Sequence, residues 1–196
     1  PLVQGMIDQV TPAAAEQYVA QLSGETPVTV DGAPYTIATR HTNSGTSIEK
    51  ATQVVGEHMA GLDLDVEYPT WTKSGYANRN VIGERTGIRN PDDIYIIGAH
   101  LDDMPNGSTA PGADDNASGS AAILIAADIL SQYQWGCTLR FAFWTGEEQG
   151  LLGSSVYAAG AKADGETVRG YLNLDMLGYN STAPRNVDLY YRVTPT

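Results

Sequence analysis

Acidic residues gather in the stretch GAHLDDMPNGSTAPGADDNASGS, which directly follows an apolar run. Four aspartates and one histidine fall within residues 98–120, and no lysine or arginine lies between Arg89 and Arg140. Carboxylates gathered without a cation would repel one another strongly in a partly buried setting. A solvated acidic loop is one interpretation and a metal site is the other. A divalent metal would supply the missing positive charge.

Further carboxylates follow two later apolar stretches. Glu147 and Glu148 come directly after FAFWTG, and Asp175 lies between Leu174 and Met176. An unpartnered charge in such a setting is costly, and a bound metal would be its partner. Mixed imidazole and carboxylate ligands suit zinc, with cobalt or manganese as replacements. One glutamate can bind metal while the other moves protons, as metal-assisted hydrolysis requires.

Each of these features also has a purely structural explanation. A lone histidine at a strand end is more often structural, but in H-L-D the side chain of Asp102 lies on the same side of an extended strand as His100 and can hold its second nitrogen. DDNASG is compatible with an ordinary helix cap, and EEQG alone is typical of a solvated turn. The cap and the metal site can coexist, because Asp115 can face a metal while its neighbours begin a helix.

Signatures of other sites are absent from the sequence. It contains no G-x-S-x-G, G-x-x-x-x-G-K-[ST], G-x-G-x-x-G or H-E-x-x-H. A glycosidase with two carboxylates would leave His100 and Asp115 without a role. Cys137 is the only cysteine, which excludes an intrachain disulfide. The formal net charge of -12 argues against nucleic acid and membranes as partners.

Strands and helices alternate around these residues. Thr11-Pro12 begins one helix, residues 47–62 form an amphipathic second one, and both are expected to cover a sheet. Further helices are expected over 118–133 and from about Leu151. The expected strands are 64–68, 78–87, 94–100, 138–145, 170–176 and 187–193. This order predicts an α/β fold with a mixed, largely parallel central sheet flanked by helices.

The strand ends place the charged residues together. His100 and Asp102 end one predicted central strand, Glu147 and Glu148 follow the next, and Asp175 ends a third. Ligands bind outside the carboxyl ends of the strands in such sheets. We therefore expect these side chains to converge on one edge of the sheet.

Four segments in order resemble a known enzyme family. GAHLDD, PGADDNASGSAA, FWTGEEQGLLGS and NLDM are similar to the co-catalytic zinc aminopeptidases of the bacterial leucyl aminopeptidase and aminopeptidase Y type. The similarity is densest from about Asn80 to Tyr179. It implies a zinc-exopeptidase fold and removal of N-terminal residues from peptides with a free N-terminus.

The resemblance also implies two zinc ions and their ligands. Asp115 would bridge the two ions, His100 and Asp175 would complete one, and Glu148 would bind the other. The peptide bond after Asp115 is often cis in this family.

Two further residues receive roles from the resemblance. Glu147 would be the general base that activates a metal-bridging water. Asp102 would orient His100 by holding the ring nitrogen that does not bind metal.

One feature departs from the family pattern. The family has a further histidine ligand downstream of NLDM, whereas this chain has no histidine after His100. His41 and His58 lie upstream and are not expected to replace it. We therefore expect residues 1–196 to be a single zinc-peptidase catalytic domain that lacks its C-terminal portion. That missing segment of the same protein would be a partner, and the start at Pro1 without methionine fits a secreted, processed protein.

Three alternative functions remain open at this point. A carboxypeptidase relative would need a basic residue for the substrate carboxylate, and none is evident near the motifs. A glutaminyl-cyclase-like acyltransferase would use one zinc. A non-catalytic binding module on a peptidase fold would not need both Glu147 and Glu148.

Overall fold

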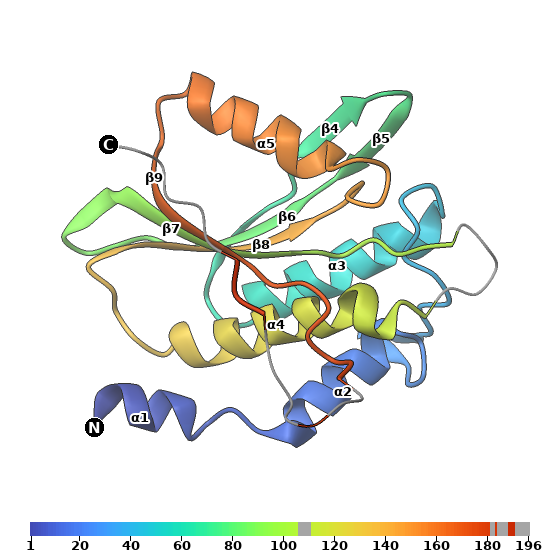
Figure 1. Cartoon of the computed structure of the whole chain (residues 1–196), viewed down its shortest axis with the longest axis horizontal. Helices are drawn as coiled ribbons and strands as arrows, with labels where there is room; N and C mark the ends of the chain where they lie inside the picture. The colour runs from blue at the N-terminus through green and yellow to red at the C-terminus, as the bar shows by residue number, and fades with distance from the viewer. Residues whose placement is uncertain (106–110, 181–182, 184–187, 191–196) are drawn as a thin grey trace.

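A computed structural model describes residues 1–105, 111–180, 183 and 188–190. A five-stranded sheet lies between helices, with α5 (Leu152–Ala163) on one face and α3 (Thr46–Ala60) and α4 (Gly119–Leu130) on the other (Figure 1). The remaining helices are α1 (Leu2–Ile7) and α2 (Pro12–Leu22), and a short π-helical turn, η1 (Ala113–Ser118), precedes α4. The strands of the sheet are β3 (Asp65–Glu67), β6 (Val81–Arg85), β7 (Asn90–His100), β8 (Cys137–Trp144) and β9 (Thr167–Asn173).

The sheet is mixed, as the sequence predicts. Its strand order is β3-β6-β8-β7-β9. β7 runs parallel to both β8 and β9, whereas β6 is antiparallel to β8 and to β3. The parallel part therefore consists of the three strands whose carboxyl ends carry the predicted site. Two small hairpins lie outside this sheet and pair β1 (Val28–Val30) with β2 (Ala33–Tyr35) and β4 (Thr70–Lys73) with β5 (Tyr76–Arg79).

Alternate side chains of β8 build two cores, one on each face of the sheet. Phe141 and Phe143 are buried in the cluster beneath α3 and α4. Ala142 and Trp144 belong to the cluster on the opposite face, against which Tyr157 of α5 packs. Successive strand residues face opposite sides, so a strand covered on both faces is a continuous apolar run.

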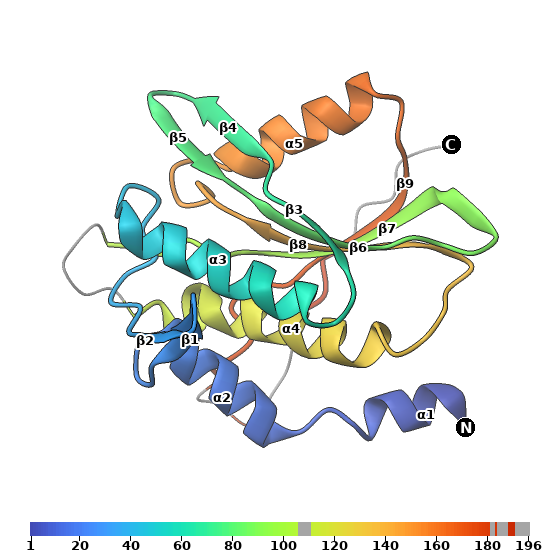
Figure 2. The same ribbon diagram turned by 180° about the vertical axis from the view of Figure 1, so that it is seen from behind.

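The helix predicted after Thr11 is present, but its packing differs from the expectation. Thr11 Oγ1 accepts the N–H of Ala14 at 3.2 Å, and Pro12 is the first helical residue. α2 was expected to cover the sheet, and it packs mainly on α4 and η1 instead (Figure 2). The reason is that α3 and α4 already occupy this face of the sheet.

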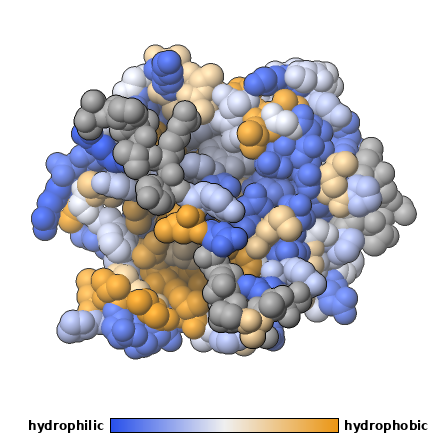
Figure 3. Space-filling model, in the orientation of Figure 1, coloured by the Kyte–Doolittle hydropathy of each residue, from blue (hydrophilic) through white to orange (hydrophobic). Residues whose placement is uncertain are grey.

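Apolar side chains remain accessible where α1 lies beside α4 (Figure 3). Met6 packs there against Ile125 and Ile129, while Leu2 and Ile7 are exposed. Among the described residues, no helix is long and apolar enough to cross a bilayer.

The strand predicted for residues 187–193 is not formed in the part of it that the structure describes. Residues 188–190 have no regular secondary structure. The rest of the predicted strand 187–193 lies outside the described residues.

Candidate metal centre

The pairing of the parallel strands brings three chain segments to one edge of the sheet. His100, the last residue of β7, lies opposite Trp144, the last residue of β8. On the other side, the N–H of Leu174, just beyond β9, donates to the carbonyl of Gly98 at 2.9 Å. The segments that follow β7, β8 and β9 therefore begin side by side, as the sequence predicts.

One imidazole nitrogen faces two carboxylates at this edge. The Nε2 atom of His100 lies 3.0 Å from Oδ1 of Asp115 and 3.5 Å from Oδ1 of Asp175. One ligand atom from each of these three residues can be chosen so that all lie within 4.8 Å of one another. The His100 side chain is 3% exposed, whereas those of Asp115 and Asp175 are 46% and 41% exposed. The group could hold a metal ion that is open to solvent on one side.

The turn that presents Asp115 is fixed by its neighbour. Asp115 and Asn116 have non-helical backbone angles within η1, and the peptide bond between them is cis, as the resemblance implies. The buried Asn116 side chain donates from Nδ2 to the carbonyl of Leu174 at 3.0 Å. Its Oδ1 accepts the N–H groups of Gly119 at 2.9 Å and of Met176 at 3.3 Å. Asn116 therefore joins the turn of Asp115 to the segment that carries Asp175.

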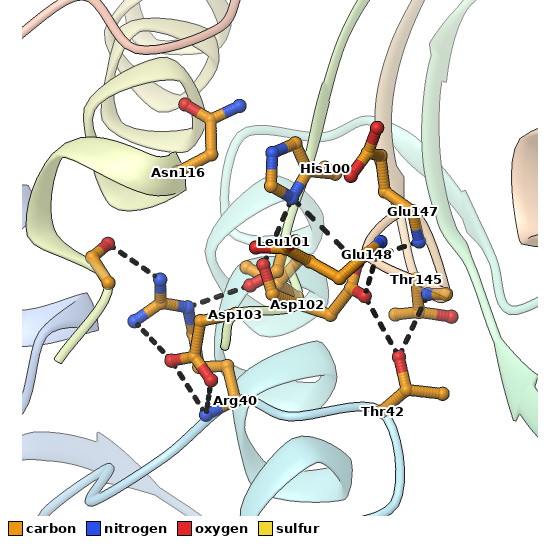
Figure 4. A network of polar contacts seen from close by, with 12 residues as sticks. Arg40, Thr42, His100, Leu101, Asp102, Asp103, Asn116, Thr145, Glu147 and Glu148 are labelled. Atoms are coloured by element: carbon orange, nitrogen blue, oxygen red, sulfur yellow. Dashed lines mark hydrogen bonds and ion pairs between the residues drawn. The ribbon is translucent and has the colours of Figure 1, made fainter. Parts of the chain in front are cut away.

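Asp102 contacts His100 mainly through its backbone. Nδ1 of His100 lies 3.0 Å from the carbonyl oxygen of Asp102 but 3.9 Å from its carboxylate (Figure 4). The sequence pattern predicts an extended strand as far as Asp102, whereas β7 ends at His100. The alternation of side chains stops there. The Asp102 carboxylate turns instead toward the segment after β8.

That segment carries the two glutamates. The Asp102 carboxylate accepts the backbone N–H of Glu147 at 3.2 Å and of Glu148 at 3.3 Å. It also accepts the hydroxyl of Thr42 at 2.9 Å. Thr42, which the sequence did not single out, accepts in turn the N–H of Gly146 at 3.0 Å.

The electrostatics of the site favour a bound cation. Burial raises the pKa of Glu147, and repulsion from the nearby carboxylates also raises it. Burial followed by repulsion from Asp115 raises the pKa of Glu148 to about 7. For His100, burial alone would lower the pKa, but the surrounding carboxylates, Asp102 foremost, outweigh it and raise the pKa. A divalent cation would remove much of this repulsion.

A buried arginine lies close to the site, contrary to the expectation that no basic residue is near. Arg40 is fully buried and forms an ion pair with Asp103. Its guanidinium donates to the carbonyls of Leu101 at 2.7 Å, Pro111 at 3.0 Å and Gly112 at 2.9 Å, and also to that of Leu22. No motif or periodicity in the sequence links Arg40 to these segments.

The two remaining aspartates of the acidic stretch accept hydrogen bonds from backbone N–H groups of other segments. Asp103 is fully buried and accepts the backbone N–H of Arg40 on both oxygens, at 3.0 and 2.9 Å. Asp114 accepts the N–H groups of Gly178 at 2.8 Å and Tyr179 at 3.0 Å. The sequence left both aspartates unexplained, because their partners lie far along the chain.

The other two histidines lie outside the His100 group, although Nε2 of His41 is 3.4 Å from Nε2 of Gln149, the residue after Glu148. His41 is buried, and its Nδ1 accepts the N–H of Asn43 at 3.1 Å. His58 lies 2.7 Å from Asp128 through Nε2. Within the part of the chain that the structure describes, the His100 group includes neither histidine. Glu148 also lies outside this three-residue group.

A hollow of about 830 Å³ adjoins the candidate ligands on the α5 side of the sheet. His100, Glu147 and Asp175 line it together with apolar residues that include Trp144 and Leu151. A mostly apolar wall with a few polar groups is typical of small-ligand sites.

Solved structures of similar fold include peptidases. LapB from Legionella pneumophila superposes with a TM-score of 0.77 at 24% identity, covering 93% of this chain and 48% of that one. BSAP, a zinc aminopeptidase from Bacillus subtilis, has a TM-score of 0.72 at 16% identity, with 85% and 69% covered. These likenesses establish the zinc-exopeptidase fold that the sequence predicts.

Comparison of sequences identifies the family. A probable leucine aminopeptidase 2 of Aspergillus oryzae is 35% identical over 137 residues, which cover 68% of this chain and 26% of that protein. An aminopeptidase of Pseudomonas aeruginosa is 42% identical over 100 residues, covering 50% and 18%. The chain thus spans about a quarter or less of the length of these relatives. Residues 80–191, more than half of the chain, match Peptidase family M28, and the chain therefore belongs to this family.

Proposed function

We propose that this chain carries the metal-binding core of a zinc-dependent aminopeptidase that removes N-terminal residues from peptides. The observation that carries the proposal is the group of His100, Asp115 and Asp175 at the carboxyl ends of parallel strands, with Glu147 lining the same hollow. Membership of a peptidase family supports it, as do relatives named leucine aminopeptidase and a structural neighbour described as a zinc aminopeptidase.

The residues present fit a zinc ion. Within the described residues, the ion pairs of Asp115 and Asp175 are with His100 alone, so both carboxylates are open to a cation. His100, Asp115 and Asp175 would hold one zinc, and Asp115 and Glu148 would contribute to a second. Bound zinc would supply a Lewis acid that polarises the scissile carbonyl and acidifies a water molecule. The further histidine that the family pattern expects for the second zinc stays a prediction.

Glu147 would move the protons. Its backbone is held by Asp102, and its half-buried carboxylate lines the hollow with His100. Burial raises its pKa, which makes the carboxylate a stronger base when ionised. It would take a proton from the attacking water and give it to the leaving amine, whose release completes cleavage of the peptide bond.

We also infer that residues 1–196 belong to one zinc-peptidase domain. The main core joins Leu22 and Ile48 from the first third of the chain to Phe141 of β8. A secreted location and a partner segment from the same protein stay predictions.

Hydrolysis of leucine p-nitroanilide by the purified chain tests this function directly. Any activity of the chain should be abolished by chelator and restored by zinc, and Glu147→Gln should eliminate it while zinc still binds. Glu16→Gln, on the exposed side of α2, is the matched control and should leave activity unchanged. Activity that survives the Glu147→Gln substitution would refute the role of Glu147.

A single-zinc acyltransferase is the second candidate. The three-residue group by itself is sufficient for one metal, and a Fimbriiglobus ruber glutaminyl cyclase shares the fold with a TM-score of 0.68 at 22% identity. One zinc per chain, with cyclisation of an N-terminal glutamine peptide and no release of leucine, would favour it. Arg40 does not offer the free positive charge that a carboxypeptidase needs for the substrate carboxylate, because its guanidinium is buried and already bound to backbone carbonyls.

A further inference from the structure

A buried threonine outside the matched family region contacts the turn that carries Glu147. Thr42 lies between β2 and α3, and 2% of its surface is exposed. Its hydroxyl is 2.9 Å from Oδ2 of Asp102 (Figure 4), and it is 3.0 Å from the backbone nitrogen of Gly146. The Thr42 carbonyl accepts the side-chain amide of Asn78 at 2.8 Å, so the threonine is itself anchored from β5.

The direction of the hydrogen bonds at Thr42 is fixed by chemistry. The backbone N–H of Gly146 can only donate, so the Thr42 oxygen must accept from it. The single hydroxyl proton is then free to go to the Asp102 carboxylate, which can only accept when ionised. The result is a chain of bonds from Gly146 through Thr42 to Asp102.

The backbone N–H groups of three consecutive residues in the turn donate to the side chains of Thr42 and Asp102. Gly146 donates to Thr42, and Glu147 and Glu148 donate to Asp102. Gly146 has a φ of +75°, and a Cβ there would lie 2.5 Å from Trp71, so only glycine fits at this position of the turn. The backbone that aims Glu147 is thus set by contacts with residue 42 as well as residue 102.

We propose that Thr42 is a positioning residue for Glu147. The proposal rests on the aminopeptidase function, in which Glu147 transfers protons. Without the hydroxyl, Gly146 would lose its acceptor and Asp102 would lose one of its donors in a buried setting, so the turn would shift or loosen. A displacement of about 1 Å at a catalytic group can cost about a hundredfold in rate.

Two variants of Thr42 and one matched control test the proposal. Thr42→Val removes the hydroxyl at nearly constant volume, and Thr42→Ser keeps it. Thr138→Val is the control: Thr138 is 1% exposed at the opposite end of β8, donates to the Pro91 carbonyl at 2.7 Å and accepts the Gly87 N–H at 3.0 Å. It has the same pattern of bonds away from the site.

The steady-state constants for leucine p-nitroanilide give the first measurement. We expect Thr42→Val to lower kcat about tenfold to a hundredfold with KM within about threefold of the original value, because a proton-transfer group is displaced rather than substrate binding lost. Thr42→Ser should restore kcat, and Thr138→Val should leave it unchanged even if thermal stability falls.

Amide hydrogen exchange of the metal-free chain gives the second measurement. Thr42→Val should speed exchange at Gly146, Glu147 and Glu148 without the same change elsewhere. An unchanged kcat in Thr42→Val, or equal loss in Thr42→Ser, overturns the proposal. If the original chain cleaves no substrate, aminopeptidase activity of this chain by itself fails. Exchange then decides alone: faster exchange confined to this turn supports the role of Thr42 in fixing it, and unchanged exchange overturns that role.

Discussion

Arg40 and Asp103 form an ion pair in which both side chains are fully buried, with 3.4 Å between Nη1 and Oδ2. The arginine also donates to the carbonyls of Leu101 and Gly112. It therefore ties the residue that follows His100 to the residue that begins the turn of Asp115. The segments of two candidate ligands, His100 and Asp115, are therefore both held by the buried side chain of Arg40.

Arg40→Met is expected to lower the free energy of unfolding by about 3 to 5 kcal/mol, because Asp103 would remain as a buried charge without its partner. Urea titration followed by circular dichroism measures this change. Arg169→Met is the matched control, since Arg169 is 55% exposed and pairs with Asp93 at the surface. Loss of such a surface pair should cost no more than about 1 kcal/mol. Equal, small effects of both substitutions would contradict a buried supporting role for Arg40.

Asp175→Asn is expected to weaken zinc binding by more than about a hundredfold, beyond the effect of residues that only support ligands. The amide keeps the size of the side chain but removes the charge that faces His100. Calorimetric titration of the metal-free chain with zinc measures the affinity. Asp164→Asn, at the C-terminal end of α5, should leave it unchanged. Equal affinities in the two variants would exclude Asp175 as a ligand.

Asp102→Asn separates two possible roles for this carboxylate. In the structure, Nδ1 of His100 meets the backbone carbonyl of Asp102, while the carboxylate holds the turn of Glu147. Zinc affinity should therefore change by less than about tenfold, whereas kcat should fall by about tenfold or more. The opposite result, a large loss of zinc affinity with kcat of the loaded enzyme intact, would show that the carboxylate acts through His100.

Metal-free protein is expected to lose thermal stability as the pH rises from about 5 to 8. Burial and then repulsion from Asp115 raise the pKa of Glu148 from 4.5 to about 7, so the folded chain holds a proton that the unfolded chain has released. The stability from this proton is present below about pH 4.5 and lost by about pH 7. The raised pKa of His100 acts in the same direction.

Thermal melts in chelator across this pH range measure the trend. The Glu148→Gln variant has no carboxyl group to titrate at this position, so its thermal stability should depend less on pH. With zinc present the trend should reverse, because metal ligands must be deprotonated. A melting temperature of metal-free protein that rises steadily toward pH 8 would contradict the assignment.

The strand ends made much of the site predictable. His100, Glu147 and Asp175 each follow an apolar run, and parallel pairing necessarily brings such ends to one edge. Thr42 and Arg40 could not be found in this way, because their contacts join distant segments through irregular loops. The backbone contact of Asp102 with His100 could not be predicted for a related reason, since strand alternation holds only as far as the end of β7 at His100.

Two hairpins were missed although the sequence signals them: one joins β1 to β2 through Asp31 and Gly32, which have positive φ, and the other joins β4 to β5. Ser74 and Gly75 both have positive φ and connect β4 to β5 in a two-residue hairpin. A Ser-Gly pair between alternating residues favours such a turn. The irregular turn at Asp115 has no comparable signal, because its conformation depends on the long-range bonds of Asn116.

The position of β9 also bears on how the chain behaves in solution. Within the described residues, β9 pairs with β7 along one side only, and Val168, Tyr171 and Leu172 are exposed on it. An unpaired strand edge favours association between molecules, whereas a net charge of -12 keeps them apart. Salt at about 0.15 M shortens the range of that repulsion to about 8 Å. Colloidal stability of the isolated chain should therefore depend on ionic strength, with light scattering rising as salt is added.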